Sequence, residues 1–472
     1  MASSPFKRLF ASFRPRRLSV RKQPTIRLRD FELLEDRVVP ANFVWTGAAG
    51  DQSWSTDTNW MGGTAPPANT TGVTLTFDSN GTAAPIMFDD ISGLKIDSMS
   101  FSASGYIIEG EAIPLTITGA ASPAISDTIG GNTIGDANMP ITLAGNILVN
   151  IAAGTDSIRS LMSGAFGVTK GGSGTLVLAG LNTFTGLTTI SNGVLKLGVQ
   201  GTATAGPLGT EAAGAAASGT VVQAGGTLDL NGFSLPPGAP PAGKGESITI
   251  SGSGFNGAGA ITNTSSTLSS YSGVITLAAN ASVIANNGAL ALLNSVTTNG
   301  FLLTVGGTAT TGTLQNLISG TGGVTKIGTG TWLANQGSSF TGGVTISAGT
   351  YKASQSQGLI ASQLGGPGGA TLVNSGAALD LNGATFAEPV PLTLNGTGVG
   401  GTGAITNSSS TAATWNGPIT VASDSTIAAS GAAITFAGGI TASAGTLKIG
   451  ATASLANSAV PDFAGTNSAV IV

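Results

Sequence analysis

The stretch that decides the fold is residues 167–198, GVTKGGSGTLVLAGLNTFTGLTTISNGVLKLG, because the chain contains it twice. It aligns without gaps on residues 323–354, GVTKIGTGTWLANQGSSFTGGVTISAGTYKAS, with 15 identical residues at an offset of 156. Short apolar runs such as 175–178 are separated by Gly, Asn, Ser or Thr, and some of the chain's runs, such as Thr-Leu-Asp-Leu at 227–230, alternate polar and apolar residues strictly. Alternation with a period of two indicates strands with one buried face, and such repeats bury that face by stacking.

The similarity continues beyond this block. GTLDLNG at 226–232 returns as AALDLNG at 377–383, and ITISGSGFNGAGAITNTSST at 248–267 returns as LTLNGTGVGGTGAITNSSST at 392–411. The offset falls only across loops, since the first copy has an extra Pro-rich stretch at 236–241. Insertions confined to corners are what a stack of equivalent rungs tolerates.

These repeats predict an all-β chain folded as a right-handed parallel β-helix. Rungs of roughly 20–25 residues would give about 17–21 turns after a basic, partly helical or disordered leader. The pairs Asn231-Gly232, Asn382-Gly383 and Asn395-Gly396 predict turns with positive φ directly after strands. An array of β-sandwiches is the alternative fold, but it requires repeats of about 100 residues with longer strands.

The expected domain organisation has four parts. They are a basic leader (1–41), an N-terminal cap with degenerate rungs (42–166), repeat copy 1 (167–322), and repeat copy 2 with a truncated third copy (323–472). Residues 1–39 hold ten basic and four acidic residues, and residues 28–39 have a helical apolar spacing. The leader lacks the apolar run of a secretory signal. Nucleic-acid binding through residues 1–29 is a weaker alternative, and we expect no nucleic-acid partner.

Composition excludes most catalytic chemistry. The chain has no His and no Cys, which removes serine and cysteine triads, imidazole or thiolate metal sites and disulfides. Charged residues are 8% of the chain, so clustered carboxylate and lysine chemistry has little material. No apolar stretch is long enough for a transmembrane helix. We therefore expect no catalytic, metal-binding or cofactor-binding residue, and no cofactor.

The few charged candidates each have a structural interpretation. Asp229 and Asp380 recur in the Leu-Asp-Leu-Asn-Gly motif and are expected to be solvated face residues before a turn. The close carboxylate pairs, Asp89 with Asp90 and Glu109 with Glu111, are expected to be surface charge, because a glycosidase needs two carboxylates across a cleft. Lys170 matches Lys326 and Lys196 matches Lys352, and this recurrence favours a role in each rung over one active site.

Three tryptophans, Trp45, Trp54 and Trp60, fall within 16 residues at the start of the body. They could form a platform for sugar stacking. An end cap for the stack is the favoured interpretation, because an uncapped edge invites further strand pairing.

Two family resemblances follow from these residues. The blocks at 167–198 and 323–354 resemble the autotransporter-associated β-strand repeat, and residues 42–77 resemble the usual opening of such passengers. Residues 31–41, FELLEDRVVPA, resemble the LEDR/LEPR-type motif found ahead of large bacterial surface proteins. The resemblance implies an exported or surface-displayed β-helical passenger.

The sequence as a whole favours a non-catalytic scaffold or adhesin-like stalk, not an enzyme, located outside the cell or on its surface. Its partner is unknown, with polysaccharide as one candidate. No strand series typical of a membrane barrel follows residue 437, so we expect export by machinery acting in trans. The alternative function is a polysaccharide-binding or polysaccharide-cleaving β-helix, which requires carboxylates and basic residues clustered on one face.

Overall fold

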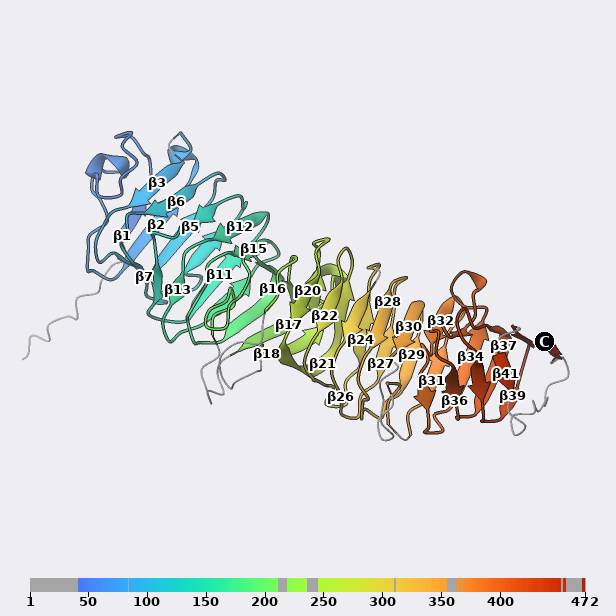
Figure 1. Cartoon of the computed structure of the whole chain (residues 1–472). Helices are drawn as coiled ribbons and strands as arrows, with labels where there is room; N and C mark the ends of the chain where they lie inside the picture. The colour runs from blue at the N-terminus through green and yellow to red at the C-terminus, as the bar shows by residue number, and fades with distance from the viewer. Residues whose placement is uncertain are drawn as a thin grey trace, which may run out of the picture. The chain divides into compact units, whose positions relative to one another are not determined.

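The computed structural model describes residues 41–83, 85–210, 219–235, 245–309, 311–354, 363–366, 368–450, 453–455 and 469–471. The predicted helix at 28–39 lies outside the described residues, as does the LEDR-type motif apart from Ala41. The unit Pro40–Val472 is a parallel β-solenoid of about 16 turns (Figure 1). All its strand ladders within the described part are parallel, which confirms the stacked all-β fold and excludes antiparallel sandwiches. The right-handed sense stays a prediction.

A full turn of the solenoid passes through three faces, and in the first turns each face carries one strand. β2 (Val73–Phe77), β3 (Ile86–Asp89) and β4 (Lys95–Ile96) make one turn, and β5 (Ser98–Phe101) then pairs with β2. In the next turn, β6 and β7 pair with β3 and β4. We call the faces that carry β2, β3 and β4 the first, second and third face.

The first face begins with β1, continues through the first halves of three long strands, and passes into a separate four-stranded sheet. Its other strands are β1 (Ala41–Val44), β8 (Ile125–Asp127), β11 (Ile147–Ile151), β14 (Val168–Gly171), β16 (Thr188–Leu197), β17 (Thr220–Asp229), β18 (Gly245–Gly252), β21 (Gly273–Ala285), β23 (Val296–Thr297), β26 (Ile318–Ser319), β33 (Thr385–Phe386), β36 (Ala413–Trp415), β38 (Ile434–Phe436) and β41 (Ala453–Leu455).

The second face runs from β3 to β39 and includes the second halves of β16, β17 and β21. Its other strands are β6 (Ile107–Gly110), β9 (Thr133–Ile134), β12 (Thr155–Ile158), β15 (Thr175–Leu178), β19 (Ile261–Asn263), β24 (Leu303–Gly306), β27 (Val324–Lys326), β29 (Val344–Ile346), β31 (Thr371–Val373), β34 (Leu392–Gly396), the first half of β37 (Ile419–Ile427) and β39 (Ile440–Ala442).

The third face begins as a four-stranded sheet and resumes at β20. Its other strands are β7 (Leu115–Ile117), β10 (Ile141–Leu143), β13 (Met162–Ser163), β20 (Ser269–Tyr271), β22 (Leu290–Leu292), β25 (Gly312–Leu314), β28 (Thr331–Ala334), β30 (Gly349–Ala353), β32 (Ala377–Asp380), β35 (Ile405–Thr406), the second half of β37, β40 (Thr446–Ile449) and β42 (Ala469–Ile471). Short 3-10 turns lie in four loops: η1 (Asp57–Asn59), η2 (Ser79–Gly81), η3 (Phe255–Gly257) and η4 (Val399–Gly401).

The core is a continuous column of inward side chains. In β15, for example, Leu176 and Leu178 are buried while Thr175 and Val177 are half-buried on the outside. Stacking identical apolar positions from turn to turn removes both neighbours' surfaces from water, which is the main favourable contribution to folding. The predicted strand runs therefore lie where the alternation placed them.

The tryptophans at the start of the body pack inside the first turns. Trp45, Trp54 and Trp60 are fully or nearly fully buried, and the Trp60 ring meets the other two edge-on at 5.2 and 6.0 Å. Trp60 Nε1 donates to the Trp54 carbonyl at 2.7 Å. Buried rings cannot stack on a sugar, so the platform interpretation is wrong, and the end cap stays a prediction.

Two details differ from expectation. The solenoid has slightly fewer turns than the 17–21 expected, because some turns are long, such as that from Thr188 to its partner Thr220. Asn231-Gly232 and Asn382-Gly383 have positive φ at both residues, as predicted. In the third pair only Gly396 has positive φ, and Asn395 remains within β34.

The two repeat copies do not lie on the same faces. Starting from β14, the first face continues through β16, β17, β18, β21, β23 and β26, which is six turns. The strand equivalent to β14 in copy 2 is β27, and β27 pairs with β24 on the second face. One copy therefore occupies six turns and one further face, so each element of copy 2 lies one face further around the coil.

Candidate functional site

The most prominent polar site on the outer surface joins three successive turns of the second face. Lys196 of β16 lies 3.2 Å from the Asp229 carboxylate of β17, and the Lys196 ammonium also donates to Thr264 Oγ1 at 3.2 Å. Thr264 donates from its hydroxyl to Asp229 Oδ2 at 2.5 Å and from its backbone N–H to Oδ1 at 3.1 Å. We call Lys196, Asp229 and Thr264 the copy-1 junction.

The same junction recurs in copy 2 on the third face. Lys352 Nζ lies 3.2 Å from Asp380 Oδ2 and donates to Ser408 Oγ at 2.6 Å. Ser408 donates to Asp380 from its hydroxyl and its backbone N–H, at 2.5 and 3.0 Å. These two are the ion pairs among the described residues.

The aspartates are structural as well as charged. Asp229 Oδ1 also accepts from the N–H of Asn231, and Asp380 Oδ1 accepts from the N–H of Asn382. Each carboxylate thereby holds the Asn-Gly turn that follows it. The expectation that Asp229 and Asp380 are solvated was wrong: their side chains are 3% and 5% exposed. Alternation places them on the outside, but the lysine and hydroxyl of neighbouring turns cover them.

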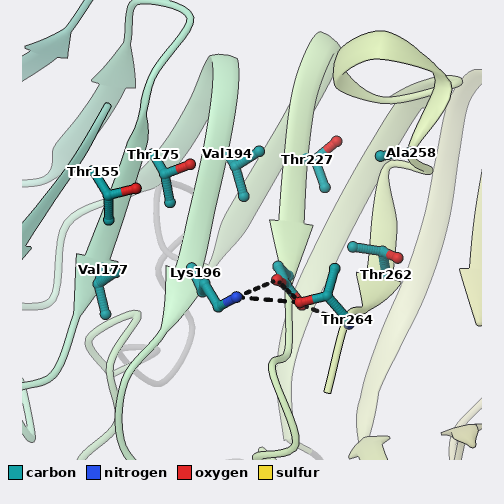
Figure 2. Close-up of a pocket in the computed structure, with 10 residues that line it drawn as sticks. Thr155, Thr175, Val177, Val194, Lys196, Thr227, Ala258, Thr262 and Thr264 are labelled. Atoms are coloured by element: carbon teal, nitrogen blue, oxygen red, sulfur yellow. Dashed lines mark hydrogen bonds and ion pairs between the residues drawn. The ribbon is translucent and has the colours of Figure 1, made fainter. Parts of the chain in front are cut away.

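A surface groove of about 400 Å³ contains the copy-1 junction (Figure 2). It crosses five turns, and its lining residues are Thr155, Thr175, Val177, Val194, Lys196, Thr227, Asp229, Ala258, Thr262 and Thr264. The loop that carries η3 lies over the outer side of β17, because Thr227 Oγ1 accepts from the Phe255 N–H at 2.8 Å and donates to the Gly259 carbonyl at 2.8 Å. This loop supplies one wall through Ala258.

The repeated lysines Lys170 and Lys326 are buried at a corner. Lys170 Nζ donates to the carbonyls of Gly171, Gly172 and Asn192 at 2.7, 2.9 and 3.2 Å. Lys326 makes the same three bonds, to Ile327, Gly328 and Ala348. Burial lowers the pKa of each lysine to about 8. These contacts join two turns in each copy, as a role in each rung predicts.

The close carboxylate pairs do not form a reaction centre. Asp89 is fully buried, Asp90 faces outward and accepts hydrogen bonds from Ser53 and Ser55, and the two therefore lie on opposite sides of the strand. Burial raises the pKa of Asp89 to about 7. Glu109 is half-buried and Glu111 exposed. The surface-charge expectation thus fails for Asp89, whose inward position follows from the alternation in β3.

The sequence did not predict a buried polar cluster formed by Asp127, Asn132 and Asp156 on two adjacent turns. Asp127 accepts from the N–H groups of Ile129 and Gly130 and from Asn132 Nδ2, while Asp156 accepts from the Asn132 N–H at 2.9 Å. Burial first, then the adjacent Asp127, raises the pKa of Asp156 to about 7. The two aspartates are 29 residues apart and not in the aligned blocks, so only the stacking of turns brings them together.

No cluster suited to a metal ion occurs in the described part of the chain, where no three Asp or Glu side chains converge. Within the same residues, no helix is long and apolar enough to cross a membrane.

Comparison with known proteins bears on the repeated blocks that build these sites. Residues 168–197 and 324–350 match the family model of the passenger-associated-transport-repeat. They fall within the two blocks found by aligning the chain on itself, and they carry both buried corner lysines and Lys196 of the copy-1 junction, while Lys352 lies two residues past the second match.

One curated protein is similar over a longer stretch. The chain is 28% identical over 330 residues to the Adhesin BmaC autotransporter of Brucella suis biovar 1 (strain 1330). The match covers 57% of this chain and 10% of that protein, so the chain spans a small part of its relative's length. No solved structure matches significantly.

Proposed function

We propose that this chain is an exported, non-catalytic β-solenoid that acts outside the cell or on its surface as an adhesin-like stalk. The observation that carries the proposal is the pair of blocks matching a passenger repeat, both folded into one parallel stack. The similarity to an autotransporter adhesin supports the same role.

The chemistry of the described polar residues supports a non-catalytic role. Each junction aspartate is held by a lysine, a hydroxyl and two backbone N–H groups, and each corner lysine is held by three carbonyls. A general acid or base needs a group that can exchange a proton with substrate within hydrogen-bond reach. The junction aspartates and corner lysines are instead fully engaged in hydrogen bonds that hold the fold. Cleavage of a polysaccharide is therefore not favoured.

The proposal is tested by adhesion and by turnover together. Beads coated with the purified full chain should bind bacterial or host cell surfaces above the level of albumin-coated beads, while polysaccharides incubated with the chain keep their chain length. Localisation is tested in the source cells by antibody labelling of intact and permeabilised cells. Cleavage of a glycan, or labelling that requires permeabilisation, would contradict the proposal.

We further propose that residues 1–41 are a targeting leader with an LEDR-type motif and that export depends on machinery in trans. The domain limits 42–166, 167–322 and 323–472 belong to the same proposal. The intact mass of the product recovered from the cell surface should lack the leader. A surface product that retains residues 1–41 would argue against a cleaved leader.

A further inference from the structure

The two junctions present the same groups on two different faces of the solenoid. The copy-1 junction lies on the second face, in the column β15, β16, β17 and β19. The copy-2 junction lies on the third face, in the column β28, β30, β32 and β35. Each copy is one face longer than six full turns, so equivalent residues of the two copies lie one face apart. The two junctions therefore open in different directions.

The exposed side of each junction offers donors and acceptors without net charge. An ammonium has three N–H donors, and Lys196 uses two of them, on Asp229 and Thr264. Lys352 likewise uses two, on Asp380 and Ser408. The hydroxyl-bearing residue, Thr264 or Ser408, is exposed in both copies. Because each lysine is paired with a buried carboxylate, the junction has no net charge and exerts little long-range attraction on a polyanion.

Hydroxyl and methyl groups both surround the copy-1 junction. In the copy-1 groove, Thr155 and Thr175 stand in register on adjacent turns, and Val177 and Val194 lie beside them. Adjacent parallel strands lie about 4.8 Å apart, so the Thr155 and Thr175 side chains are separated by about that distance, and Val194 follows them in the same row on the next turn. Such a surface matches a chain that carries hydroxyl groups at its edges and C–H groups on its faces.

We propose that each junction binds a segment of an uncharged, hydroxyl-rich glycan, so that one protein chain holds two glycan chains on two faces. The lysine donates its third N–H to a sugar hydroxyl, the Thr264 or Ser408 hydroxyl accepts from another, and at the copy-1 junction the methyl groups of the groove pack against the ring. This inference rests on the proposed adhesive function and names its ligand class.

The first experiment measures how many sites each chain has. Purified full chain is applied to immobilised dextran, mannan and laminarin, with hyaluronan and heparin as anionic comparators. Where a neutral glycan is retained, calorimetry with its heptasaccharide should give two sites. Lys196→Met and Lys352→Met should each leave one site, and the double variant should bind at least tenfold more weakly.

Matched controls separate ligand contacts from folding. Lys448→Met removes an exposed lysine of β40 that belongs to neither junction and should keep two sites. Lys196→Gln and Lys352→Gln are the second pair of variants, and circular dichroism checks that each variant is folded. Retention on none of the three neutral glycans, retention that the double variant keeps, or stronger retention on heparin would overturn the proposal.

The second experiment tests the two directions. With a long neutral polysaccharide that binds, the wild-type chain should cross-link polymer molecules and increase light scattering, whereas either single-site variant should not. Equal cross-linking by the single-site variants would overturn the two-site arrangement. Adhesion of coated beads to cells is measured separately with the double variant, so adhesion that persists would refute this ligand assignment without refuting the adhesive function.

Discussion

At the scale of single residues, the chain buries several of its few charged groups and satisfies most of them locally. Lys170 and Lys326 reach three carbonyls each, and Asp229 and Asp380 each hold a turn. A buried polar group costs free energy unless it is hydrogen-bonded. Asp89 and Asp156 are the exceptions among the described residues, because Oδ2 of each is buried and has no hydrogen-bond partner.

Asp89 should make stability depend on pH. Its folded pKa of about 7 lies above the unfolded value of about 3.9, so its contribution is fully present below pH 4 and is lost as pH rises through 7. Asp89→Asn should therefore raise the free energy of unfolding by about 1–3 kcal/mol at pH 8, and much less at pH 5. Thermal melts at both pH values measure this. Glu111→Gln is the exposed control, and an equal effect of Asp89→Asn at both pH values would contradict the assignment.

The corner lysines should contribute equally in both copies. Lys170→Met and Lys326→Met each keep the side-chain volume but leave three carbonyls without their donor, which should cost about 1–3 kcal/mol. Denaturant unfolding measures the loss, with Lys448→Met as the exposed control. If both buried variants unfold like the control, the ammonium groups do not stabilise the corners.

At the scale of elements, the corners between strands restrict the residue type more than the strands do. Gly193, in β16, has φ +69°, and a Cβ there would lie 2.4 Å from the Gly172 carbonyl oxygen and 2.9 Å from Lys170 Nζ. Its copy-2 equivalent, Gly349, has φ +65° and the same type of neighbours, including Lys326 Nζ at 2.8 Å. Glycine is needed there because the backbone is left-handed and the turn below is in contact.

Alanine substitutions can separate those two causes. Gly257 has φ +77° but nothing within 4 Å of its Cβ position, so Gly257→Ala should cost only the conformational strain of about 1–2 kcal/mol. Gly193→Ala and Gly349→Ala add a clash with the turn below and should cost clearly more. Urea unfolding of the three variants provides the comparison. Equal losses would show that close contact between turns is not what selects glycine at Gly193.

At the scale of the whole solenoid, the repeat length is not a whole number of turns. We call the resulting offset between equivalent strands the phase of the repeat. A copy of six turns and one face places equivalent strands in neighbouring columns. Loop lengths between strands set this phase, because each corner only has to bring the chain to the next face. Equivalent surface groups are thereby distributed around the coil.

Engineered disulfides can test this phase, since the chain has no Cys. Thr304 of β24 and Thr325 of β27 are register partners on the second face. Partners on adjacent strands have Cα atoms about 4.8 Å apart, within the range of a disulfide. Thr304→Cys with Thr325→Cys should therefore oxidise fully, as thiol titration would show. Ser319→Cys with Thr325→Cys, the pair that would stack if the copies were in phase, should stay reduced. The reverse result would contradict the register.

The sequence by itself determined the all-β class, the parallel stack and the position of most strands, because alternation and turn residues are local properties. It also determined the repeated role of Lys170 and Lys326, since internal repetition is visible without a structure. The burial of Asp229 was decided only by the tertiary structure, because a lysine and a threonine from other turns cover it. The same holds for the Asp127 and Asp156 cluster and for the faces on which the junctions lie. These features depend on which turns stack on which, and the stacking register is set by the sum of all loop lengths between them.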